Sequence, residues 1–253
     1  MKTVSNAIDD SQFFVRQHYL DFLSRDPDVS GFQFWSGEIT SCGTNLGCRE
    51  VKRINVSAAY FLSIEFQETG YLVHRLNRAS FGSLPRFLTF LTDTQLIGRR
   101  VVVGQTGWEQ QLETNKKSFV NLWTSRDVFK ARYDAMSNSQ YVDALIANTG
   151  VAFTSAERTA LINGLTNGSQ TRATVLRTVA ENSLFTTKEK NPAFVLMQYF
   201  GYLRRNPDDE PDGNLSGYNF WLNKLNSFGG DFQRAEMVKA FIVSVEYRQR
   251  FGP

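Results

Sequence analysis

The sequence predicts an all-α protein built from helical repeats. Residues 14–28 return in closely similar form as residues 194–208, near the other end of the 253-residue chain. Both copies carry apolar residues at helical spacing, and each ends in a Pro-Asp pair. The longest run of β-branched residues, 101–103, is too short to define a sheet. A repeat of this length indicates a helical repeat architecture.

Each copy predicts a helix, a tight turn and a second helix. In the first copy Pro27 disfavours α geometry at the preceding residue, so the first helix ends there. Ser30 is suited to cap the next helix, which carries a Phe-Trp pair. The second copy has the same pattern at residues 216–221, after the six extra residues 209–214. The insertion is the main difference between the copies.

A third helical segment completes each repeat, at residues 51–66 and 236–247, and both contain a Ser-x-Glu-aromatic motif. The middle of the chain is more degenerate, with helical spacing over 118–136 and 171–185. We therefore expect roughly ten helices, with two clear repeats flanking a diverged middle unit. The expected segments of one compact domain are a first repeat at 11–78, a connecting segment at 79–137, a middle unit at 138–190 and a second repeat at 191–253.

Composition excludes several classes of protein. A net charge of +3, with no Lys/Arg run longer than two, lacks the dense basic stripe that nucleic acid binding needs. No stretch approaches the length of apolar sequence that spans a membrane. Residues 1–6 lack the apolar core of a signal peptide. We expect no nucleic acid partner, no transmembrane segment and no signal peptide in this chain.

Cys42 and Cys48 are the only cysteines and lie in a Gly-containing loop. A metal site would need further Cys or His residues nearby, and a redox motif would need closer spacing. A local disulfide is therefore favoured over two free thiols, and it would indicate an oxidising compartment.

One motif recurs in both copies and is interpreted as structural. Its residues are Arg25, Asp28, Gly31 and Trp35 in the first copy and Arg205, Asp208, Gly217 and Trp221 in the second. An arginine at this place can bond helix-terminal carbonyls or the nearby Asp, and a tryptophan can fill the helix–helix joint. Ligand binding by these residues is the alternative, but aromatic residues at helical spacing are usually core residues.

This motif, with the Ser-x-Glu-aromatic segment, resembles the bacterial family labelled domain of unknown function 4214. The same skeleton is similar to the repeat of phycobilisome linker domains, a helical scaffold. Members of the family usually occur as modules within large secreted or surface proteins, and no family-wide catalytic residues are known to carry over. The resemblance therefore implies an extracellular or cell-surface accessory role.

The insertion in the second copy is the best candidate metal site. Counted from Asp208, oxygen-bearing side chains alternate in the manner of a calcium loop, with a glycine at position 6. The candidate ligands are Asp208, Glu210, Asp212 and Asn214. Asn219 stands where a calcium loop has a bidentate Glu, so a solvated acidic turn is the competing interpretation. Calcium is the one cofactor that the sequence suggests.

A second candidate site lies outside the repeats, where aromatic residues, including Phe81, could stack on a sugar ring. Its candidate ligand-binding residues are Tyr71, Arg99, Gln105 and Trp108. The competing interpretation is that this stretch packs between helical units.

No catalytic motif is present, and of the two histidines His18 is matched by Gln198 in the second copy. We therefore expect a non-catalytic accessory module that binds envelope glycan or a partner protein. A self-assembling scaffold is the first alternative, and a helical glycan-active enzyme is the second, because paired carboxylates need no sequence motif.

Overall fold

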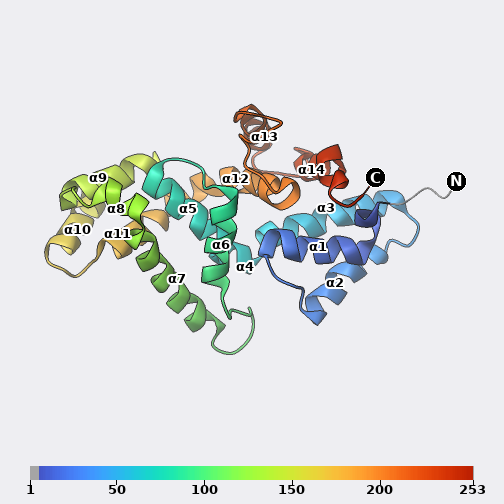
Figure 1. Ribbon diagram of the computed structural model, residues 1–253, viewed down its shortest axis with the longest axis horizontal. Helices are drawn as coiled ribbons and strands as arrows, with labels where there is room; N and C mark the ends of the chain where they lie inside the picture. Colours follow the sequence, from blue (N-terminus) through green and yellow to red (C-terminus); the bar gives the residue numbers. More distant parts are fainter. Residues whose placement is uncertain (1–5, 253) are drawn as a thin grey trace. The chain divides into compact units, whose positions relative to one another are not determined.

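All regular structure in the computed structural model is helical, as predicted, over residues 6–252, which are the residues that the structure describes (Figure 1). The chain forms two compact units. Unit 1 combines the residues up to Phe66 with those from Asn191 onward, and unit 2 is Gln67–Lys190. The two ends of the chain thus share one unit. Residues 67–78, expected in the first repeat, belong to unit 2, because helix α5 contacts α6, α9 and α11 there.

Unit 1 contains a short 3-10 helix, six α-helices and one π-helical turn, and its two parts come from opposite ends of the sequence. They are η1 (Ala7–Asp9), α1 (Ser11–Leu23), α2 (Val29–Thr40), α3 (Leu46–Leu62), η2 (Tyr199–Leu203), α13 (Ser216–Ser227), α14 (Met237–Val243) and α15 (Val245–Gln249). Helix α1 contacts α2, α3 and η2, and α14 contacts α3. The two halves of the unit therefore share one core.

Unit 2 is built around α5, which contacts three other helices of the unit. Its helices are α5 (Gly70–Phe81), α6 (Phe87–Gly98), α7 (Trp108–Ser125), α8 (Asp127–Tyr133), α9 (Asn138–Thr149), α10 (Ser155–Thr166) and α11 (Arg172–Ala180). Two further helices cross the boundary between the units, α4 (Ile64–Glu68) and α12 (Ser183–Gln198). No helix within residues 6–252 combines the length and apolar character needed to cross a bilayer.

The described residues form more helices than the roughly ten expected, because single extended residues divide longer helical stretches. Ser63 has φ −62° and ψ 147° and separates α3 from α4. Ser244 takes the same conformation, with φ −61° and ψ 144°, between α14 and α15. In both places the serine hydroxyl accepts from the backbone N–H three residues later, which starts the short second helix.

Asp28, and not Ser30, caps helix α2. The Asp28 carboxylate accepts from the Gly31 backbone N–H at 2.7 Å, and the Ser30 hydroxyl donates to that carboxylate at 2.8 Å. The aspartate of the Pro-Asp pair therefore stabilises the start of the helix. Its carboxylate accepts from a backbone N–H of the first turn, and its negative charge complements the positive end of the helix dipole. The expected cap was therefore two residues too late.

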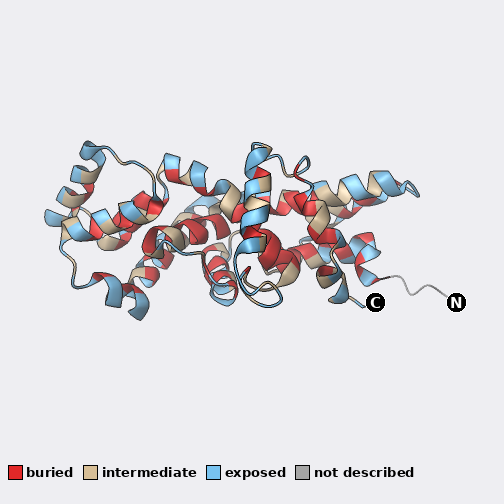
Figure 2. Cartoon of the chain, turned by 90° about the horizontal axis from the view of Figure 1, so that it is seen from above, coloured by how far each residue is buried: buried red, intermediate tan, exposed pale blue. Residues whose placement is uncertain are grey.

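His18 lies at the centre of unit 1 and is 1 % exposed. Its Nδ1 bonds the Phe14 carbonyl at 2.8 Å, and its Nε2 bonds the Ser57 hydroxyl at 2.8 Å. Gln198 makes the corresponding contact in the second half, where its Nε2 donates to the Phe194 carbonyl at 3.0 Å. Figure 2 shows that many helices have a buried side and an exposed side. Both polar side chains are buried, since Gln198 is 2 % exposed.

We predict that His18→Gln flattens the acid sensitivity of folding. Burial lowers the pKa of His18 from 6.5 to about 3. Between these values the unfolded chain binds a proton at this position that the folded chain does not bind, so the free energy of unfolding falls as pH falls. The loss should reach about 2 kcal/mol by pH 5. Urea unfolding of the wild type and the variant between pH 7 and pH 4 measures this change in the free energy of unfolding.

The matched control is His74→Gln in unit 2, since burial also lowers the pKa of His74. Each variant should remove only its own part of the pH dependence. Gln at position 18 can keep the bond to the Phe14 carbonyl, as Gln198 does for Phe194. An unchanged slope in His18→Gln between pH 6.5 and pH 4 would contradict the assignment.

Candidate functional site

The motif arginine of the second copy lies at the centre of a corner, which we call the Arg205 corner. Arg205 follows η2, and its Nε donates to Glu246 of α15 at 2.6 Å. Its Nη2 donates to Glu246 at 3.0 Å and to Asp212 at 2.7 Å. The guanidinium lies 5.5 Å from the centre of the Tyr199 ring. Burial works against the charge of Arg205, but the bonds to the two carboxylates outweigh it and raise its pKa.

The Arg25 corner in the first half has the same construction. Arg25 donates from Nε and Nη2 to the two carboxylate oxygens of Glu65, at 2.9 and 2.8 Å. Asp28 forms a longer ion pair with it, at 3.6 Å, and the guanidinium lies 4.9 Å from the centre of the Tyr19 ring. The hydrogen bonds to Glu65 raise the pKa of Arg25.

The structure assigns the motif aspartate of the second copy to Asp212, not to Asp208. A methyl group at Gly31 would meet the Tyr19 hydroxyl and the Asp28 carboxylate. The same group at Gly217 would meet the Tyr199 hydroxyl at 2.8 Å and Asp212 Oδ1 at 3.3 Å. Asp208 is exposed. The inserted residues displace the corner aspartate along the sequence, so residue spacing alone misplaces it.

These corners join helices, and their guanidinium groups are engaged by carboxylates of the same chain. The tryptophans lie against the third segment of each half, with Trp35 6.4 Å from the Tyr60 ring centre and Trp221 5.7 Å from that of Phe241. Residues of the Arg205 corner, among them Arg205, Asp212 and Glu246, also line a cavity of about 230 Å³. The arrangement supports the structural interpretation of the motif.

The predicted calcium ligands do not converge. Asp212 is bound by Arg205, and Asn214 Oδ1 accepts from the Ser216 backbone N–H at 2.7 Å. Asp208 and Glu210 are exposed. Among residues 6–252, no group of three or more His, Cys, Asp or Glu side chains is arranged to hold a metal ion. Calcium binding by this loop stays a prediction, and it would require the loop to rearrange.

The four predicted ligand-binding residues occupy different environments. Tyr71 is 4 % exposed in α5, its hydroxyl donates to the Thr186 carbonyl and the Arg75 guanidinium lies 4.2 Å from its ring centre. Arg99 and Gln105 are exposed between α6 and α7, and Trp108 begins α7 half-buried. Tyr71 thus offers almost no surface to a sugar, because its ring packs into the core of unit 2.

Unit 2 instead holds a cavity of about 560 Å³ that combines aromatic and polar side chains, and we call it the α5–α7 cavity. It is lined by Asn77, Phe81, Leu88, Thr89, Thr92, Asp93, Trp123, Arg126 and Val128. Of these residues the sequence singled out only Phe81, from the aromatic stretch around it. The others come from four segments and share no motif, so spacing could not have found them.

Hydrogen bonds orient the polar wall of the α5–α7 cavity. Asp93, 4 % exposed, accepts two hydrogen bonds from Arg126, one of them 2.9 Å long. The Arg126 guanidinium lies 4.6 Å from the Trp123 ring centre, and Trp123 Nε1 donates to the Ser80 hydroxyl at 2.9 Å. Asn77 Oδ1 is buried and has no hydrogen-bond partner. If the Asn77 side chain turned toward the cavity, a ligand hydroxyl could supply the missing donor.

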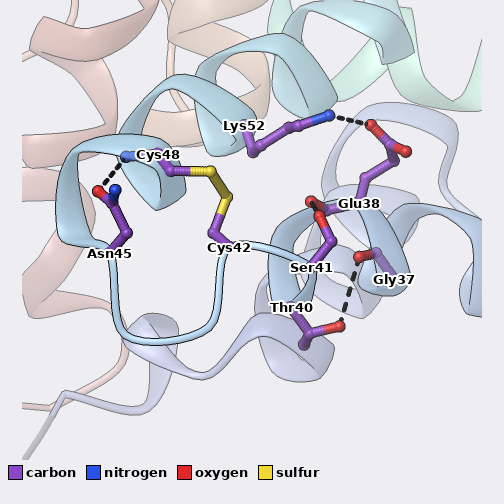
Figure 3. Close-up of a disulfide and its surroundings, with 8 residues drawn as sticks. All are labelled: Gly37, Glu38, Thr40, Ser41, Cys42, Asn45, Cys48 and Lys52. Carbon is purple, nitrogen blue, oxygen red and sulfur yellow. Dashed lines mark hydrogen bonds and ion pairs between the residues drawn. A yellow bond between two sulfur atoms is a disulfide. The ribbon is translucent and has the colours of Figure 1, made fainter.

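The predicted disulfide between Cys42 and Cys48 is present and joins the end of α2 to the start of α3 (Figure 3). Within the closed loop, Asn45 Oδ1 accepts from the Cys48 backbone N–H at 3.0 Å and caps α3. Lys52 of α3 pairs with Glu38 of α2 at 2.6 Å on the same side (Figure 3). The bond therefore fastens the α2–α3 connection.

Unit 1 is thus an all-helical unit, and in each of its halves an Arg–Glu pair joins the first and third segments. Residues 177–251, which include the Arg205 corner, match the family model described as Domain of unknown function (DUF4214). The match covers less than a third of the 253 residues and occurs once. No curated protein and no solved structure matches the chain.

We predict opposite effects for two alanine substitutions in α2. Gly31→Ala should lower the free energy of unfolding by about 1–3 kcal/mol, because its methyl group overlaps the Tyr19 hydroxyl. Gly37→Ala should raise it by about 0.5–1 kcal/mol, since nothing lies within 4 Å and alanine favours the helix. Denaturant unfolding at pH 7 measures both.

Tyr19→Phe provides the test of the cause, because it removes the hydroxyl that Gly31→Ala meets. The double variant should recover part of the loss. Equal effects of the two alanines, or no recovery, would show that the Gly31 contact does not constrain the corner.

Proposed function

We propose that this chain is a non-catalytic accessory module, outside the cell or at its surface, that binds glycan in the α5–α7 cavity. The observation that carries this proposal is the pairing of an aromatic wall with a buried amide oxygen that lacks a partner. Sugar rings present apolar faces that stack on aromatic rings, and their hydroxyls donate hydrogen bonds. The cavity volume falls within the usual range for small-ligand sites.

The wall of the cavity favours binding over hydrolysis. Glycoside hydrolysis generally uses two carboxyl groups on either side of the scissile bond. The lining of this cavity includes one, Asp93, and both its oxygens accept from Arg126. An Asp–Arg pair of this kind presents fixed acceptors and donors to hydroxyl groups.

Unit 1 is, in this proposal, a pair of copies of the DUF4214 repeat. The family match supports the second copy directly. The first copy is supported by the equivalent contacts of Arg25 with Glu65 and of His18 with the Phe14 carbonyl. The disulfide supports an oxidising location, because such bonds persist outside reducing compartments.

The test is retention of the purified chain on insoluble polysaccharides and on protease-treated bacterial envelope. We expect retention of the wild type and its loss in Asn77→Leu and in Phe81→Leu. Asn77 Oδ1 has no partner to lose, so replacing it should leave the fold nearly unchanged. Leu184→Ala, which truncates an exposed side chain of unit 2 outside the cavity, is the control.

If both cavity variants were still retained, the glycan would bind somewhere other than the α5–α7 cavity. Absence of retention on every glycan would overturn the proposal. Retention on untreated envelope alone would show a protein partner instead. Each preparation is also measured with and without calcium, which tests the acidic loop separately.

A second candidate function, self-association as a scaffold, is favoured by a different observation. Phe34 and Phe220, which precede the motif tryptophans, are each 58 % exposed. Leu62 and Val243, at matched places in the third segments, are 51 % and 54 % exposed. Apolar side chains that stay exposed at equivalent positions are suited to bury against a second copy of the chain.

Sedimentation equilibrium over a wide concentration range tests this alternative. A scaffold should show a mass that rises with concentration, and Phe34→Ser together with Phe220→Ser should abolish the rise. Leu88→Ser, which alters an exposed residue of unit 2, is the control. A monomer at all concentrations would exclude self-association through these residues.

A further inference from the structure

A second pocket, which we call the α3–α14 pocket, lies within unit 1 and has a volume of about 270 Å³. It is formed by residues of α3 and α14 together with η1, α1, α2 and α15. Its lining residues are Asp9, Ser11, Ile39, Leu46, Arg49, Glu50, Arg53, Ile54, Lys239, Ile242, Val243 and Arg248. Neither the motif corners nor the α5–α7 cavity contributes to it.

The lining carries more positive than negative charge. Four of its residues are cationic and two are acidic. Both acidic residues are engaged by cations of the same pocket. Asp9 accepts from Arg248 through both oxygens at 2.8 Å, and Glu50 pairs with Lys239 at 2.7 Å. Two arginines, Arg49 and Arg53, remain beyond these pairs.

The bonds of Arg53 go to neutral acceptors. Its Nη2 donates to the Ile8 carbonyl at 2.9 Å, its Nη1 donates to the Asp9 carbonyl at 3.4 Å and its guanidinium lies 4.1 Å from the Phe14 ring centre. Burial lowers the pKa of Arg53, and Asp9 and Tyr247 act in the opposite direction. These contacts hold the guanidinium in place without neutralising it.

Arg49 has a buried donor with no partner. Its Nε is shielded from solvent and has no hydrogen-bond acceptor in the folded chain. A buried donor left unsatisfied costs free energy, and a small turn of the Arg49 side chain toward the pocket would let an anion there supply the acceptor. Two arginines on successive turns of α3 are suited to a carboxylate, since guanidinium groups bind carboxylates through paired hydrogen bonds.

The remaining wall is aliphatic and limits the ligand further. Ile39, Ile54 and Ile242 contribute branched side chains, and Leu46 and Val243 extend the apolar surface. The volume lies just below the usual range for small-molecule sites, so the ligand must be small. We infer that the α3–α14 pocket binds a small aliphatic carboxylate, with its charged end at Arg49 and Arg53 and its chain against the isoleucines.

The experiment is isothermal titration of the intact chain with octanoate, below the concentration at which octanoate forms micelles. We expect saturable binding of octanoate and at least about tenfold weaker binding of octanol and of acetate. Octanol lacks the negative charge, so it tests the role of the arginines. Acetate lacks the hydrocarbon chain, so it tests the role of the aliphatic wall. Octanoate binding no tighter than that of octanol would overturn the role of the arginines.

Two variants with the same change in net charge locate the site. Arg49→Gln should weaken octanoate binding about tenfold. Lys52→Gln, on the same helix but outside the lining, should leave it unchanged. Equal weakening by both would indicate non-specific attraction, and no heat with the wild type at millimolar octanoate would also overturn the inference. Folding of each variant is checked by its unfolding midpoint.

Discussion

Within each half of unit 1, an arginine at the end of a first helix pairs with a glutamate in the third segment and fixes how these helices meet. Arg25 and Glu65 are 40 residues apart in sequence, and Arg205 and Glu246 are 41 apart. Each pair has two hydrogen bonds, and the arginine also lies beside a motif aspartate and a tyrosine ring. A partly buried pair with several bonds is costly to break on one side, because the remaining charge would be left uncompensated. The glycine beside each corner leaves room for that tyrosine hydroxyl.

The two halves of unit 1 meet through polar groups as well as apolar ones. His18 bonds Ser57, and the Ser57 hydroxyl also contacts the hydroxyl of Tyr202 from the second half. Gln198 takes the place of His18 in that half and bonds its own helix only. The two side chains therefore make the same bond to a backbone carbonyl four residues earlier in their own helix. Only His18 also bonds a residue of another helix. This explains why the side chain at this position can differ between the two halves of unit 1.

The two ligand sites that we propose lie away from the motif, and this follows from how the motif is used. Its arginines are engaged by carboxylates of the same chain, so they offer little to a ligand. The α5–α7 cavity and the α3–α14 pocket contain polar atoms that the fold leaves without partners, on Asn77 and Arg49. Such groups cost free energy in the folded chain, and that cost is the physical argument for a ligand. The motif residues thus join helices within unit 1, and the proposed ligands would contact other side chains.

The sequence by itself determined the helical class, the turn at each Pro-Asp and the disulfide. These depend on local preferences or on short loops, as with Pro27 and with Cys42 and Cys48. Tertiary structure decided that Asp212 is the aspartate of the Arg205 corner. The insertion changes the number of residues between the motif positions, but Asp212 still lies beside Gly217 as Asp28 lies beside Gly31. It also decided that Tyr71 is buried and that Asp93 and Arg126 share a cavity wall. Residues so far apart in sequence meet only when helices pack, and no local pattern records which of their faces will meet.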